Sequence, residues 1–177
     1  LSEDQPTGET WRSAAEIAVD AVERAYEGKA KGISTGLPKL DDFTGGGRPG
    51  TLWVLGGATS MGKSVGGQQL AVNVAKMKDL SGRPYGVAYV HLEMDNEEVG
   101  IRLASALAFQ FDRINEIGPM ANPYYLSAVN QKLHEAQWAR MRDAAKHVAP
   151  QLQIYVDDRP GRTVSQIESA TARLFQK

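Results

Sequence analysis

Residues 57–64 of the chain read GATSMGKS, which fits the phosphate-loop pattern G-x-x-x-x-G-K-[ST]. The apolar run 51–56 before it predicts a buried parallel strand, and the run from 65 to about 78 predicts a helix. A strand that delivers such a loop to a helix N-terminus directs backbone N–H groups and the positive end of the helix dipole at one small volume. The stretch therefore predicts a site for a multiply charged phosphate.

The residue types inside this loop suit that chemistry. Gly57 and Gly62 allow backbone angles and a close approach that a side chain would block. Lys63 adds a mobile positive charge for the β and γ phosphates, and the Ser64 hydroxyl is suited to ligate a Mg²⁺ that bridges them. The residues predicted to contact the nucleotide are Gly57, Thr59, Ser60, Met61, Gly62, Lys63, Ser64 and Val65. The alternative interpretation is a glycine-rich connection that only turns a strand into a helix.

Composition narrows the class of protein. A length of 177 residues suits one domain, and the absence of cysteine excludes disulfides and thiolate metal sites, as expected for a protein of the reducing cytoplasm. No apolar run approaches the roughly 20 residues of a membrane span, so no membrane association is expected. The net charge of −1 offers no basic excess for nucleic-acid binding. Because the chain starts without methionine, we expect it to be a piece of a longer protein.

Hydrophobic periodicity places further elements on either side of the loop. A helix is predicted at about 11–27, with a capping box formed by Ser13 and Glu16 and a stop at Gly28. Its apolar stripe can pack on its own domain or dock on a neighbouring subunit, and both interpretations remain open at this point. The run 87–93 predicts a second strand, which ends in Glu93. Since ligands of parallel sheets bind beyond the carboxyl ends of the strands, Glu93 can face the γ phosphate.

The rest of the chain alternates helical and strand patterns. Helices are predicted from the capping box Asp95–Glu98 onward, from Asn122 to about residue 148, and over 164–175 behind a third capping box at Thr163. A third strand is predicted at 152–156. The three histidines are too far apart in this pattern to predict a metal site, and each is expected to be a solvated or core residue.

Several stretches together resemble the C-terminal motor domain of DnaB-type replicative helicases, which has a RecA-like fold. They are GISTG at 32–36, LDDFTGG at 40–46, the phosphate loop, HLEM at 91–94, IYVDD at 154–158, PG at 160–161 and TVSQI at 163–167. The resemblance implies an α/β fold: a partial RecA-like P-loop NTPase core over 32–177, with a parallel sheet flanked by helices. Residues 1–31 then form an N-terminal arm and an amphipathic linker helix, which favours docking of that helix on an adjacent subunit.

The same resemblance implies a function and partners. Such a protein binds ATP with Mg²⁺ at the subunit interfaces of a hexamer and couples hydrolysis to separation of DNA strands. Single-stranded DNA, a helicase loader and a primase are the implied partners. Lys63 and Glu93 take the catalytic roles, with Glu93 activating the attacking water and Ser64 holding the metal. The alternative for Glu93 is a helix-capping or solvated carboxylate beside Asp95.

The chain departs from the family pattern at its end. It stops at Lys177, before the strand expected to carry the Walker B acid, and before the DNA-contacting loops and the arginine finger. We therefore expect the 177-residue chain alone to bind nucleotide weakly and not to unwind DNA. Asp157 and Asp158 are interpreted as a turn and cap pair. Two other functions stay open: a hydrolysis-dead module that docks on a helicase or loader, and a recombination-type or clock-type ATPase with the same fold.

Overall fold

The computed structural model describes residues 12–28, 30–92, 94–114, 128–157, 159 and 161–175. The chain divides into two units, residues 1–53 and 54–177, which are treated separately below. In the part of the chain that the structure describes, no helix combines the length and the apolar character needed to cross a bilayer.

The first unit begins with helix α1 (Ala14–Tyr26). The predicted capping box is present, since the Glu16 N–H donates to Ser13 Oγ (3.2 Å) and the Ser13 N–H donates to Glu16 Oε2 (3.0 Å). Gly28 follows the helix with φ +72° and stops it as predicted. No described residue of α1 is buried, and Val22 is 67% exposed, so the helix leaves its apolar stripe uncovered within its own unit.

The second helix of this unit, α2 (Pro38–Thr44), is held by a carboxylate at its first turn. Asp41 accepts hydrogen bonds from Ser34 Oγ (2.6 Å), from Thr35 Oγ1 (2.7 Å) and from the Thr35 N–H (2.8 Å). Beyond the helix, the chain returns and pairs Ile33 with Gly47 in an antiparallel bridge. The two segments approach so closely that a Cβ on Gly32 would lie 2.7 Å from backbone atoms of the returning segment.

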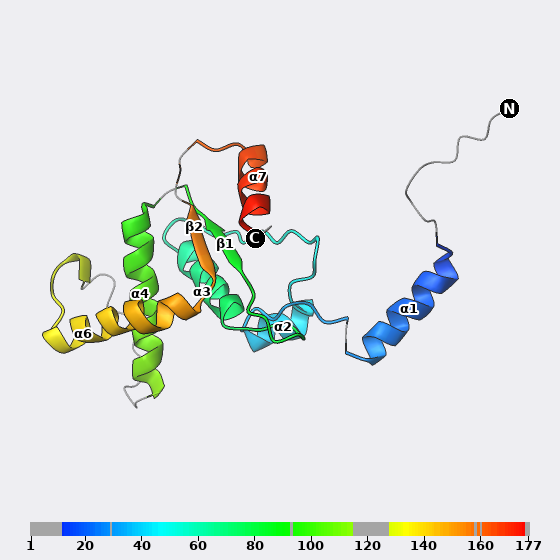
Figure 1. The fold of residues 1–177 in the computed structure, drawn as a ribbon, viewed down its shortest axis with the longest axis horizontal. Helices are drawn as coiled ribbons and strands as arrows, with labels where there is room; N and C mark the ends of the chain where they lie inside the picture. The colour runs from blue at the N-terminus through cyan, green and yellow to red at the C-terminus, as the bar shows by residue number, and fades with distance from the viewer. Residues whose placement is uncertain are drawn as a thin grey trace. The chain divides into compact units, whose positions relative to one another are not determined.

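The second unit is built on two parallel strands, β1 (Val87–Val90) and β2 (Ile154–Asp157). Their register pairs Val87 with Ile154 and Val90 with Asp157, so both strands end at the same edge. Figure 1 shows the two strands between α7 and the helices α3 and α4. The observed architecture is the predicted one, a parallel sheet flanked by helices.

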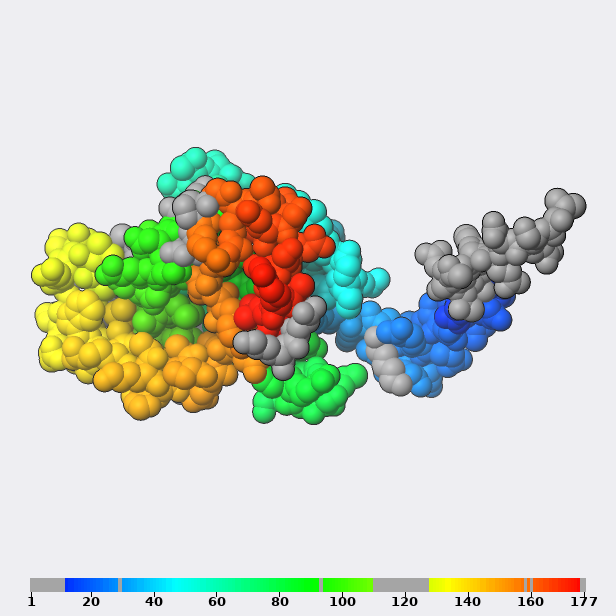
Figure 2. Space-filling model, turned by 45° about the horizontal axis from the view of Figure 1, so that its top comes forward, coloured from blue at the N-terminus to red at the C-terminus, as the bar shows by residue number. Residues whose placement is uncertain are grey.

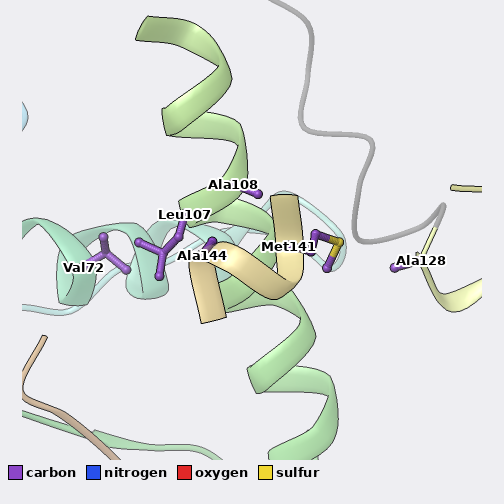
Figure 3. Close-up of a cluster of buried hydrophobic side chains, with 6 residues drawn as sticks. All are labelled: Val72, Leu107, Ala108, Ala128, Met141 and Ala144. Atoms are coloured by element: carbon purple, nitrogen blue, oxygen red, sulfur yellow. The ribbon is translucent and has the colours of Figure 1, made fainter. Parts of the chain in front are cut away.

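The helices of this unit supply its core. They are α3 (Lys63–Ala75), α4 (Asn96–Ile114), α6 (Glu135–Asp143), the π-helical segment η1 (Ala144–Val148), the 3-10 turn η2 (Ala149–Gln151) and α7 (Val164–Phe175). Val72 from α3, Leu107 from α4 and Met141 from α6 meet in one buried cluster, drawn in Figure 3. Leu107 is 2% exposed, and burial of a leucine side chain stabilises a fold by about 1.5–3 kcal/mol. The cluster therefore fixes α3, and the loop at its start, against α4 and α6.

The prediction of a strand immediately before the phosphate loop is wrong. Residues 51–56, all of which the structure describes, form no strand, and Leu52 and Val54 are 87% and 85% exposed. A strand is held by ladder hydrogen bonds to a neighbour, and in the described residues β1 pairs with β2 alone. Without a paired strand on either side, an apolar run lacks the hydrogen bonds that would make it a strand.

The long helix predicted from Asn122 to residue 148 is also not continuous. Residues 115–127 lie outside the described residues, and Asn130–His134 are not helical. Gln131 has φ +54°, a left-handed angle that no helix interior contains. A new helix, α6, starts after His134, whose backbone N–H donates to Gln137 Oε1 (3.0 Å).

Other predicted boundaries hold within a few residues. Helix α7 spans the predicted range behind the capping box of Thr163 and Gln166, with N···O distances of 3.0 and 3.3 Å. Helix α3 begins two residues before the predicted start and ends at Ala75. Asp95 caps α4 by accepting from the Glu98 N–H at 2.7 Å.

Candidate phosphate-binding site

The loop at 57–64 is shaped by one turn with an uncommon backbone angle. The Met61 N–H donates to the Ala58 carbonyl (3.3 Å), which closes a four-residue turn. Ser60, the third residue of that turn, has φ +63°, as a type II turn requires. A left-handed angle at a residue with a side chain costs about 1–2 kcal/mol. Such strain is typical of binding loops and is maintained here by the helix that follows.

Helix α3 begins directly behind this turn and leaves donors free. Gly62 is its N-cap with φ +85°, and the Gly66 N–H donates to the Gly62 carbonyl (2.8 Å). No side chain caps the helix. The backbone N–H groups of Lys63, Ser64 and Val65 therefore have no acceptor among the described residues. Three adjacent N–H groups without such an acceptor, at the positive end of a helix, have the chemistry that binds an anion.

The Lys63 side chain folds back over the loop. Its Nζ donates to the carbonyl oxygens of Gly57 and Ala58, both at 2.9 Å. An ammonium group has three N–H donors, so one remains for a phosphate oxygen. These two bonds hold the positive charge against the Gly57–Ala58 end of the loop.

The structure brings the predicted loop residues together and leaves them accessible. All residues from Gly57 to Val65 are exposed, with Met61 at 75% and Val65 at 57%. Glu93, the predicted water-activating residue, lies outside the described residues. The sequence prediction did not include Ala58, because any residue can supply a backbone carbonyl and the pattern leaves that position open.

The loop also contains a side chain that is suited to ligate a nucleotide-bound Mg²⁺. Ser64 is the second residue of α3 and carries an exposed hydroxyl, an oxygen ligand of the type that Mg²⁺ takes together with phosphate oxygens and water. The described residues contain no group of three His, Cys, Asp or Glu side chains that could hold a metal without a ligand's help.

The carboxyl edge of the two strands carries a second polar cluster. The His91 N–H donates to the Asp157 carbonyl (3.1 Å) and so continues the ladder by one residue. The Asp157 carboxylate accepts from Arg159 Nε and Nη2, both at 2.9 Å, and Arg162 Nη1 lies 3.2 Å from it. The hydrogen bonds from Arg159 hold the pKa of Asp157 below its ordinary value of 3.8. The prediction of a turn and cap residue at Asp157 is therefore wrong: its backbone pairs with Val90 as the last residue of β2, and its carboxylate is fixed by two arginines.

His91 is the residue of this edge whose environment the sequence did not predict. It is 7% exposed, and neither ring nitrogen has a hydrogen-bond partner among the described residues. The Tyr89 ring lies 5.9 Å from its ring, centroid to centroid. A histidine within an apolar strand pattern is compatible with either a solvated or a buried position. The sequence pattern alone therefore could not predict that His91 is buried.

A family model and the similar curated proteins point to the same protein family. The model of the DnaB-like helicase C terminal domain matches residues 32–177. Replicative DNA helicase DnaB of Buchnera aphidicola subsp. Schizaphis graminum is 27% identical over 146 residues, which cover 82% of this chain and 28% of that protein. Replicative DNA helicase DnaB of Rickettsia typhi is 30% identical over 151 residues, with the same coverage of 82% and 28%. This chain thus spans about 28% of the length of these curated relatives.

A solved structure shares the fold. It is an ATPase domain that superposes with a TM-score of 0.70 at 20% sequence identity, over 94% of this chain and 53% of that chain. This similarity confirms the predicted RecA-like fold class.

Proposed function

Because the chain belongs to the family of DnaB-like helicase C-terminal domains, we propose that it is the ATP-binding part of a replicative DNA helicase. In the protein that contains it, ATP hydrolysis drives the separation of DNA strands. The family match favours this function over a recombination-type or clock-type ATPase. The division into an N-terminal arm and linker helix (1–31) and an ATPase region (32–177) belongs to the same proposal.

The geometry of Lys63 is the observation that carries this proposal. Its ammonium group lies over the loop on two carbonyl oxygens at 2.9 Å, while the first-turn N–H groups of α3 lack acceptors among the described residues. Both features are what binding of the β and γ phosphates of a nucleotide requires. A loop that only connected a strand to a helix would need neither.

Three residues at the start of α3, together with Glu93, then have defined roles. The N–H groups of Lys63, Ser64 and Val65 donate to phosphate oxygens, and the third Lys63 donor reaches the γ phosphate. Ser64 Oγ would hold a Mg²⁺ bound with the nucleotide, and the ion would neutralise phosphate charge. Glu93 accepts a proton from the attacking water, a contribution typically of order 10² to 10⁴ in rate.

Helix α1 supports assembly into a ring. Ile17 and Val22 are 52% and 67% exposed, and no described residue of the helix is buried. An uncovered apolar stripe on a capped helix is suited to dock on another subunit, and we assign it to the adjacent subunit of a hexamer. Single-stranded DNA binds through parts of the protein outside this chain, and a loader or primase are the further partners. The location is the cytoplasm.

Two measurements on the full-length protein test the proposal. Titration with a fluorescent ATP analogue in the presence of Mg²⁺ should show binding, and phosphate release should show hydrolysis stimulated by single-stranded DNA. Glu93→Gln should retain the affinity and lose hydrolysis by a factor of about 10² or more. If Glu93→Gln hydrolyses at the normal rate, the role of Glu93 is wrong. If the wild-type protein binds ATP but neither hydrolyses it nor displaces strands, it is a docking module and not a motor.

A further inference from the structure

An acidic pocket lies between the first turn of α4 and the segment that leads into α6. It has a volume of about 820 Å³, and the residues that matter for its chemistry are Asp95, Glu97, Glu98, Ile101, Val129 and Trp138. Figure 2 shows the green residues of α4 beside the yellow residues that begin at Ala128. The pocket is separate in sequence from the phosphate loop, and its lining begins at Asp95, two residues after Glu93. The proposed helicase function makes no use of these lining residues.

The charge of this pocket is only partly balanced. Glu98 is paired with Arg102, whose Nη2 lies 2.7 Å from Glu98 Oε1. Asp95 uses one carboxylate oxygen to cap α4 at 2.7 Å. Glu97 is exposed and forms no hydrogen bond or ion pair with any described residue. Negative charge therefore remains at the rim, which repels phosphate and favours a cation.

Apolar side chains, one of them aromatic, line the pocket beside its carboxylates. Ile101 and Trp138 are half-buried, and Val129 is 54% exposed. An aromatic ring beside carboxylates favours binding of an arginine side chain. Its guanidinium stacks on the ring and pairs with a carboxylate, and its methylene stem covers apolar surface. The cavity lies within the volume range of sites that take whole ligands, so it has room for more than one side chain.

We propose that the acidic pocket, formed by Asp95, Glu97 and Trp138, is a docking site for an arginine-containing basic segment of a partner protein. Charge complementarity selects the basic segment, and the indole ring selects arginine over lysine. The proposal does not depend on the nucleotide site, so either can fail without the other.

The test uses the 177-residue chain and a labelled peptide, fluorescein-Arg-Leu-Arg-Leu-Arg-amide, followed by fluorescence anisotropy without nucleotide at low salt. Binding should weaken about tenfold in Glu97→Lys and about two- to fivefold in Trp138→Phe. The matched control is Glu168→Lys, an equal charge change at an exposed position of α7, which should weaken binding less than about twofold. A lysine version of the peptide should bind more weakly than the arginine version.

Three results would overturn the proposal. One is absence of peptide binding to the wild-type chain, and another is an equal loss in Glu97→Lys and Glu168→Lys, which would mean non-specific attraction. The third is equally tight binding of N-acetyl-arginine amide, which would make the occupant a small cation instead of a protein segment. The far-UV circular dichroism spectrum and the urea midpoint of Glu97→Lys should match those of the wild-type chain, which shows that the variant is folded.

Discussion

Lys63 Nζ and the Gly57 carbonyl oxygen, six residues apart in the chain, are joined by a hydrogen bond of 2.9 Å that closes the loop over the start of α3. The loop thus holds its ammonium group in place before any ligand is considered. Such preorganisation reduces the entropy that binding must overcome, because the lysine side chain has already lost much of its rotamer freedom.

Replacement of Lys63 should therefore affect binding more than stability. Lys63→Ala should weaken the affinity for a fluorescent ATP analogue by at least about tenfold, because one full positive charge facing the phosphates is lost. The free energy of unfolding should change by less than about 0.5 kcal/mol, since the residue is exposed. Lys146→Ala, at an exposed lysine of η1, is the matched control and should leave the affinity unchanged. Unchanged affinity in Lys63→Ala would show that the phosphate lies elsewhere.

Two glycine-to-alanine changes near the start of α3 should change the free energy of unfolding in opposite directions. Gly62 has φ +85°, and a Cβ there would meet no atom within 4 Å, so Gly62→Ala costs only backbone strain, about 1–2 kcal/mol. Gly67 lies inside α3 and is also open, so Gly67→Ala should raise the free energy of unfolding by about 0.5–1 kcal/mol. Urea denaturation measures both. A stabilising Gly62→Ala would contradict the left-handed angle.

The turn at 57–64 and the helix start behind it could be predicted from the sequence because they depend on local chemistry. Glycines at two fixed positions, a lysine and a hydroxyl in the first helical turn are all visible in eight consecutive residues, 57–64. The helices with matching caps were predicted for the same reason, as α7 and its Thr163–Gln166 box show.

One wrong prediction depended on distant partners, and another depended on a helix start that has an unusual cap. The apolar run 51–56 has the composition of a strand, but a strand also needs neighbours, and sequence periodicity does not say which neighbours are present. The break before α6 was missed because histidine is an unusual N-cap residue and the apolar spacing continues across it. Glu93 stays a prediction, since it lies outside the described residues.

The last turn of α7 should be sensitive to a methyl group on Gly86. A Cβ there would lie 2.4 Å from Phe175 Cε1, and that ring also contacts Tyr155 edge-on at 6.2 Å between centroids. Gly86→Ala should lower the free energy of unfolding by about 1 kcal/mol, because the Phe175 ring must leave its position. In the Phe175→Ala background the same change should cost nothing. An equal cost in both backgrounds in this double-mutant cycle would show that the ring is not the obstacle.

The two ring nitrogens of His91 have no partner among the described residues, which predicts that an apolar side chain is tolerated there. A buried polar group without a partner costs about 1–3 kcal/mol, so His91→Leu should leave the free energy of unfolding unchanged or raise it by about 1 kcal/mol. His147→Leu is the control, since His147 is exposed and lies 3.8 Å from Asp143 in an i,i+4 pair; it should shift stability by less than about 0.5 kcal/mol. A loss of more than about 1 kcal/mol in His91→Leu would reveal a hydrogen-bond partner for the ring in solution.

The arginine clamp on Asp157 makes part of the stability depend on pH. Hydrogen bonds from Arg159 hold the folded-state pKa of Asp157 below 3.8, so the charged carboxylate stabilises the fold above about pH 4. That contribution is lost as the pH falls through the lowered pKa, because the folded state must then take up a proton that weakens the clamp. Asp157→Asn should therefore destabilise the chain at about pH 6, and its difference from the wild type should shrink toward about pH 2. A constant difference for Asp157→Asn across this range would mean that Arg159 does not hold the carboxylate in solution.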